Sequence, residues 1–293
     1  MSVQDFLGVA AVGAVAGAVA SVASTLLKDY LFPLQLERWK MRQALLKTFN
    51  KYRDPIVRSA EELYYRVSEI FEKGFQYLAQ DSAGDASRRL PSGAGFKFYD
   101  APFYVKYKRL STVYRFCAFL GWLELYRTDA RFLAPEDQAL TSMLDKRMAR
   151  IQAILADRKL LASADRDQWS DCVIFREEQR AIGQMMLRKA PDSDVCIAGY
   201  KHFCEEILQK ESRWVSLIED FLGGIDPNAP HDFRLIRLRA LCVYLIDLLT
   251  SLAPKKTTVQ LLNNRAEYLG SLREHVRETQ NSGLHLYEMG DLA

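Results

Sequence analysis

A stretch of 22 residues near the N-terminus, residues 6–27, contains no charged side chain and constrains the fold more than any other feature. As an α-helix it is about 33 Å long, which matches a hydrocarbon core of roughly 30 Å. Nine of its residues are Leu, Val or Phe, diluted by seven Ala and three Gly. Insertion into a bilayer is therefore favourable by a narrow margin. The sequence predicts a single transmembrane helix over residues 6–27.

Three alternatives to a membrane span fit this segment less well. A cleaved signal peptide normally has basic residues before its apolar stretch, whereas residues 1–5 contain Asp5 and no Lys or Arg. In a buried soluble helix, each glycine in the interior would cost about 1 kcal/mol relative to alanine. An interfacial amphipathic helix needs a polar face, which this segment lacks.

The charges that flank the segment predict its orientation. No basic residue precedes it, and five follow between residues 28 and 47: Lys28, Arg38, Lys40, Arg42 and Lys47. By the positive-inside rule, the short N-terminus (residues 1–5) lies outside the cytoplasm and the bulk of the chain lies inside. We therefore expect a single-pass protein of the inner cell membrane. Tyr30, Phe32 and Trp39 follow closely, as aromatic residues do at a membrane interface.

Small residues recur every four positions along the segment. Gly13, Gly17 and Ser21 form one ridge, and a second contains Ala16, Ala20 and Ser24. Such ridges let two helices approach closely in lipid, where packing drives association. An Ala- and Gly-rich segment also shows this spacing by chance. We expect self-association through Gly13, Gly17 and Ser21, and hence a homo-oligomer.

The rest of the chain alternates helical patterns with short breakers, and no run predicts strands joined by tight turns. We expect a basic juxtamembrane helix over residues 28–55, a cytoplasmic helical domain over 56–282 and a tail over 283–293. Pro55 suits the first turn of a helix, and apolar residues after it recur on one face. Residues 80–102 are rich in Gly, Pro, Ser and Asp and predict a loop. The fold class is all-α: one transmembrane helix followed by a soluble helical bundle.

Motifs that indicate catalysis or a cofactor are absent from the sequence. It contains no HExxH, no paired CxxC, no phosphate-binding loop and no Gly-x-Ser-x-Gly elbow. A nucleophile–His–acid set that is assembled only in space stays open. The net charge is +3, from 40 basic and 37 acidic residues, which is not the footprint of a dedicated nucleic-acid binder. We expect a non-enzymatic protein with no cofactor and no specific nucleic-acid partner.

Five scattered cysteines, an odd number, predict reduced thiols rather than a disulfide framework. The best metal-ligand set is Cys196, His202 and Cys204, with Cys242 further along the chain. On a helix, however, His202 and Cys204 are two residues apart and point to different faces. Buried thiols and a surface imidazole explain these residues better than a metal site.

Two polar groups of residues are candidates for interaction. Arg176 and Arg180 lie four apart on a predicted helix, where Glu177 can pair with Arg180. These three residues recognise a partner, form a buried ion-pair network or form surface ion pairs. Gly183 weakens the same helix, so we expect another element to pack closely against it. Asp247 interrupts an apolar run, and we expect it to lie at the edge of the core and accept a hydrogen bond.

Three blocks of the sequence carry a resemblance to a known family. They are KYRDPIVRSAEELYYRVSEIF (51–71), STVYRFCAFLGWLELYRTDARFL (111–133) and FREEQRAIGQMM (175–186). The blocks resemble a largely bacterial family of membrane-anchored helical proteins of unknown function, in which an N-terminal hydrophobic segment precedes a helical body. The resemblance implies this architecture and no catalytic residues.

These patterns together predict a membrane-tethered, non-enzymatic helical module for protein–protein interaction or self-assembly at the cytoplasmic membrane face. Its expected partners are the lipid bilayer, further copies of itself and a protein that the sequence does not identify. The alternative is an oligomeric membrane effector that forms a pore in stress or phage defence.

Overall fold

The computed structural model describes residues 21, 28–29, 32–72, 101–130, 139–156, 173–189, 195–223, 225, 232–256 and 258–281. Most of these residues are helical, so the expected all-α fold is confirmed. The elements are, in order, α2 (Phe32–Glu72), α3 (Ala101–Ala130), α4 (Ala139–Ala156), α5 (Arg176–Met185), β1 (Leu187–Lys189), β2 (Val195–Ile197), α6 (Tyr200–His202), the π-helix η5 (Phe203–Ile207), α7 (Leu208–Lys210), α8 (Ser212–Leu222), α9 (Phe233–Leu252), the 3-10 helix η6 (Pro254–Lys256) and α10 (Val259–Asn281).

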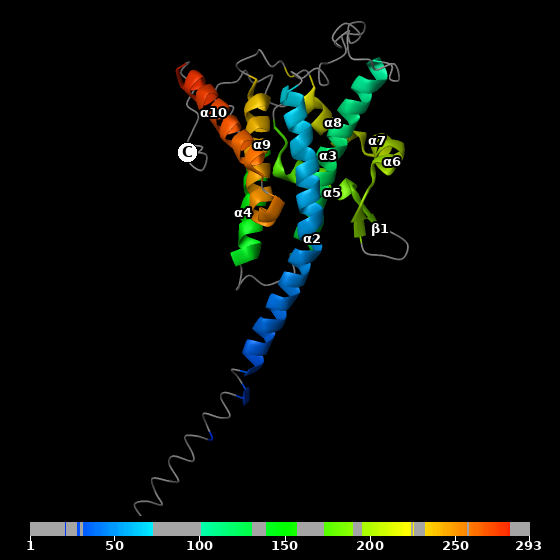
Figure 1. Cartoon of the computed structure of the whole chain (residues 1–293). Helices are drawn as coiled ribbons and strands as arrows, with labels where there is room; N and C mark the ends of the chain where they lie inside the picture. Colours follow the sequence, from blue (N-terminus) through cyan, green and yellow to red (C-terminus); the bar gives the residue numbers. More distant parts are fainter. Residues whose placement is uncertain are drawn as a thin grey trace, which may run out of the picture.

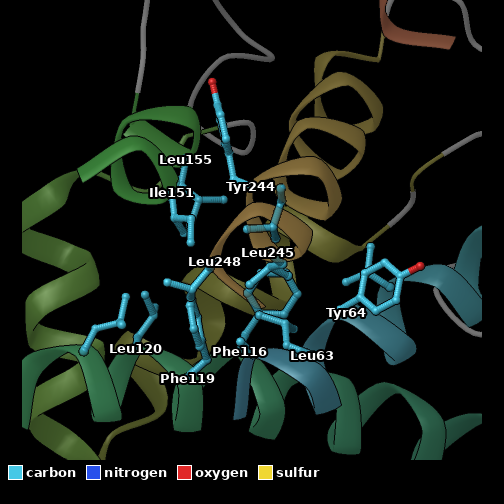
Figure 2. Packing of buried hydrophobic residues seen from close by; sticks show 14 of the residues in the cluster. Leu63, Tyr64, Phe116, Phe119, Leu120, Ile151, Leu155, Tyr244, Leu245 and Leu248 are labelled. Carbon is cyan, nitrogen blue, oxygen red and sulfur yellow. The ribbon is translucent and has the colours of Figure 1, made fainter. Parts of the chain in front are cut away.

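Helix α9 lies at the centre of the bundle and packs against α2, α4 and α10 (Figure 1). Every residue from 240 to 246 is buried, so this helix has no solvent-facing stripe there and needs neighbours on all sides. Leu245 of α9 lies in one apolar cluster with Leu63 of α2, Phe116 of α3 and Leu155 of α4 (Figure 2). Asp232 begins the helix, because its carboxylate accepts a hydrogen bond from the Arg234 N–H at 3.0 Å.

Helices α3 and α5 cross at two glycines. A Cβ atom on Gly183 of α5 would lie 2.7 Å from the carbonyl oxygen of Leu120 and 2.8 Å from Cβ of Glu124. A Cβ atom on Gly121 of α3 would lie 3.0 Å from Cβ of Met186. No larger side chain fits at Gly183 without moving the α3 backbone. The prediction that another element packs closely against Gly183 is therefore confirmed.

A small β-hairpin corrects the prediction that the chain has no paired strands. β1 and β2 pair antiparallel, with Leu187 opposite Ile197 and Arg188 opposite Cys196. Each strand has three residues, too few for an alternation of period two to be recognised in the sequence. The hairpin lies against α3, where Cδ1 of Ile197 approaches Gly121.

One helix boundary also differs from the sequence prediction. α2 is a single helix of 41 residues that continues through Pro55, so no helix begins there. Pro55 has no N–H, and the carbonyl of Lys51 therefore lacks its usual partner within the helix. The helical stretch that begins at Tyr200 is interrupted at Glu211 and ends at Leu222, before Gly223.

The predicted transmembrane segment lies outside the described residues, apart from Ser21, which is helical and exposed. Within the described part of the chain, no helix combines the length and the apolar character needed to cross a membrane. The N-terminus (1–5) and the tail (283–293) are also outside it, and so is the predicted loop, except that α3 already begins at Ala101.

Candidate membrane-proximal site

The first part of α2 extends away from the rest of the bundle (Figure 1). Every residue from 32 to 43 is exposed, and among the described side chains of α2 the first buried one is that of Phe49. At the helical rise per residue, residues 32–48 extend over about 25 Å before Phe49. Residues 32–43 are called the stalk below.

The stalk concentrates exposed apolar side chains. Nine large hydrophobic side chains are exposed among the described residues, and five of them lie in the stalk: Phe32 (72%), Leu34 (52%), Leu36 (51%), Trp39 (58%) and Met41 (42%). Single exposed apolar residues are common on soluble proteins, whereas a contiguous group marks a surface that contacts something else. The stalk is therefore the strongest candidate for an interaction surface in the described structure.

The apolar side chains of the stalk surround the helix rather than lining one face. Phe32, Leu36 and Trp39 are spaced by four and three residues, which places them on one face. Leu34 and Met41 are seven residues apart and share the opposite face. A helix that docks onto one protein needs a single apolar stripe. Apolar residues on opposite faces fit surroundings that are apolar on every side of the helix.

Basic residues are interleaved with these apolar side chains. Arg38, Lys40 and Arg42 alternate with Trp39 and Met41, and residues 32–43 contain one acidic residue. Lys and Arg can leave their aliphatic stems in an apolar region while the charged ends reach phosphate groups and water. Trp is enriched at the same depth, and basic residues mark the cytoplasmic side. This composition is typical of a helix that leaves a bilayer.

Contacts at the base of the stalk fix α2 onto α3. The hydroxyl group of Tyr52 donates a hydrogen bond to Oδ2 of Asp129, and Nζ of Lys51 lies 3.5 Å from the same atom. The Tyr52 ring meets the ring of Tyr126 edge-on, with centroids 6.1 Å apart. Burial, followed by the hydrogen bond to Asp129, raises the pKa of Tyr52. The direction of the stalk is therefore set by the body of the protein.

The residues predicted to mediate interactions lie partly outside the described residues and partly on α5. Gly13 and Gly17 lie outside the described residues, whereas Arg176 and Glu177 are exposed in the first turn of α5. Arg180 is half-buried, and its Nε has no hydrogen-bond partner within the described part of the chain. The predicted pairing with Glu177 is not made through that atom. A role for these residues in interaction stays a prediction.

Sequence reasoning missed the polar links that hold α5 in place. Nε2 of Gln179 donates to the Ile174 carbonyl at 2.7 Å, and Nε2 of Gln184 donates to Oε1 of Glu124 at 3.0 Å. Arg127 donates to both oxygens of Glu124, at 2.8 and 2.6 Å. Glu124 is buried, so these donors satisfy a charge that would otherwise be costly there. The one signal in the sequence that could have indicated these links is Glu124 itself, a glutamate within an apolar run.

Asp247 lies where it was predicted, at the edge of the core. Its carboxylate accepts hydrogen bonds from Arg265 of α10 at 2.6 and 3.3 Å, and from Nη1 of Arg147 of α4 at 3.3 Å. The prediction that it accepts a hydrogen bond is confirmed. Because two guanidinium groups neutralise it, Asp247 links three helices and needs no catalytic explanation.

The described cysteines are free thiols. Cys117 and Cys242 are fully buried, and this burial raises the pKa of both thiols, which makes them poor nucleophiles. Cys196 and Cys204 are half-buried. Nδ1 of His202 lies 3.0 Å from Oε1 of Glu206, one turn further along the chain. Within the described ranges, no three His, Cys, Asp or Glu side chains are placed to hold a metal ion.

Comparisons of the chain with protein-family models, with curated proteins and with solved structures give no match. The family resemblance of the three sequence blocks therefore stays a prediction.

Proposed function

We propose that this protein is a non-enzymatic, membrane-tethered helical module. Residues 6–27 span the inner membrane, the stalk lies at the cytoplasmic interface, and the bundle is held in the cytoplasm, where it binds partner proteins or further copies of itself. The observation that supports this proposal best is the group of exposed apolar side chains on opposite faces of the stalk.

The stalk strengthens an anchor that is weak by itself. The nine Leu, Val and Phe residues of the uncharged segment favour insertion by about 3–5 kcal/mol in total. Burying the exposed remainder of five large stalk side chains contributes on the order of 5 kcal/mol, at about 1.5–3 kcal/mol for each full burial. The two segments together hold the chain at the membrane more firmly than the span does alone.

The tether is tested by fractionating membranes that contain the full chain or a chain without residues 1–28. This deletion removes none of the described core, which begins at Phe49. After an alkaline carbonate wash, the full chain should stay in the membrane pellet and the shortened chain should be released. Release of the full chain would contradict the proposal. A pore-forming effector would in addition depolarise cells on overexpression, which a tether does not do.

The contribution of the stalk is tested with the shortened chain and lipid vesicles. Replacing Phe32, Leu36 and Trp39 together by serine should abolish its residual flotation with vesicles. The matched control replaces Val259 and Leu262, which are exposed on α10, by serine and should leave flotation unchanged. Equal losses in both variants would show that the stalk has no special role.

A further inference from the structure

Two helices pack along α9, and they are held there in different ways. α4 has 18 residues, and among its described side chains it buries five apolar ones: Leu144, Met148, Ile151, Ile154 and Leu155. α10 is longer, with 23 residues, but among its described side chains it buries two apolar ones, those of Leu261 and Leu272. Hydrophobic burial therefore holds α10 less firmly than α4.

Polar contacts supplement the apolar packing of α10, to which Tyr268 and Leu269 also contribute as partly buried side chains. Side chains of three α10 residues donate hydrogen bonds to α2 and α9: Asn264 Nδ2 to Tyr64 Oη (2.8 Å), Arg265 Nε to Asp247 Oδ1 (2.6 Å) and Tyr268 Oη to Ser68 Oγ (3.1 Å). Hydrogen bonds of this kind add little net stability, because both partners bind water once they separate. Contacts of this type fix the orientation of α10 but oppose its release only weakly.

The part of the surface beneath α10 that makes its polar contacts tolerates exposure to water, whereas Phe71 and Cys242, which face Tyr268, are covered by α10. Asp247 keeps a second guanidinium partner, because Nη1 of Arg147 on α4 lies 3.3 Å from its Oδ2. Release of α10 therefore leaves no unpaired charge at this position. The hydroxyl groups of Tyr64 and Ser68 can be hydrated in the same way. The single turn η6 connects α9 to α10 closely in sequence, so a released α10 stays beside its binding surface.

We propose that α10 is a releasable cover: it detaches from α2 and α9 as one unit while the rest of the bundle stays folded. Its release exposes a polar strip that includes Tyr64, Ser68 and Asp247. Cooperative units that open below the global unfolding free energy are found where buried apolar contacts are few. This inference does not depend on the membrane proposal, because it concerns only the described bundle.

The cover is tested by hydrogen exchange and mass spectrometry on the full chain in mild detergent. Backbone amides of α10 should exchange on the order of tenfold faster than those of α4, with a denaturant dependence that is shared along α10 and weaker than that of α4. If α10 and α4 exchange at the same rate and with the same denaturant dependence, α10 opens only with the whole bundle, and the proposal is wrong.

A matched pair of variants sharpens this test, because Arg265 and Arg147 bind the same carboxylate from different helices. Arg265→Gln should accelerate exchange in α10 several-fold further and leave α4 unchanged. Arg147→Gln should have a much smaller effect than Arg265→Gln on exchange in both α4 and α10, because apolar packing holds α4. If Arg265→Gln has no effect, or accelerates α4, α9 and α10 together, the proposal is overturned.

Discussion

The two ends of α2 belong to one helix but use apolar residues differently. Its second half buries a stripe with a spacing of three or four residues, formed by Ile56, Ala60, Leu63, Val67 and Ile70, each 0% exposed. The stalk carries apolar residues at a similar density and buries none of them. The difference shows that apolar residues in a helix require apolar surroundings but do not specify whether the protein itself supplies them. In the stalk, we infer that the bilayer supplies them.

The largest expected effect separates the two halves by stability. Leu63→Ala should lower the free energy of unfolding by about 2–5 kcal/mol, because it leaves a cavity in the core. Leu36→Ala makes the same chemical change in the stalk and should cost less than about 0.5 kcal/mol. Urea unfolding of the chain without residues 1–28 measures both values. A comparable cost at Leu36 would show that the stalk packs against protein.

A smaller effect is expected at Pro55, which lies between the two halves. Because proline in a helix interior is about 3 kcal/mol less favourable than alanine, Pro55→Ala should stabilise the shortened chain by about 1–3 kcal/mol. Pro33→Ala is the matched control in the first turn of α2, where proline is tolerated, and should change little. If Pro55→Ala destabilises the protein, the proline is itself a requirement of the fold.

The smallest effect is a loss of stability at alkaline pH that comes from the body. Burial is the main cause that raises the pKa of Tyr64, Tyr126 and Tyr268. Above about pH 9 the unfolded chain releases these protons while the folded chain keeps them, so stability falls as pH rises, by about 1 kcal/mol at pH 10.5 for each of Tyr126 and Tyr268. Tyr126→Phe should remove one such share in unfolding curves measured between neutral and alkaline pH.

The stalk provides the control for this pH dependence. Residues 32–43 contain no tyrosine, cysteine or histidine, so Trp39→Ser should leave the alkaline decline unchanged. A decline that disappears in Trp39→Ser, or that persists in full in Tyr126→Phe, would assign it to other groups.

Features that a single unusual residue reveals could be predicted from the sequence. Gly183 weakens its helix and Asp247 interrupts an apolar run, so each implied compensation, which the structure supplies as a close helix crossing and two guanidinium groups. The aromatic interface predicted after the uncharged segment included Phe32 and Trp39. It did not include Leu36, although this residue lies between them on the same face.

Features that depend on partners distant in the chain could not be predicted. The hairpin strands are too short to show a period, and they form because β2 packs beside Gly121. The link between Glu124 and Gln184 requires α3 and α5 to cross. Continuation of α2 through Pro55 results from packing on both sides of it, which outweighs the local preference of proline for a first turn.

The position of Trp39 tests the central claim most directly. The full chain and Trp39→Phe are reconstituted in vesicles with plain or brominated lipids, and the difference between their emission spectra gives the contribution of Trp39. We expect lipids brominated near the headgroup end of the acyl chain to quench this contribution, and lipids brominated deeper in the chain to quench it less. If brominated lipids leave the contribution of Trp39 unchanged, the stalk does not lie at the membrane interface.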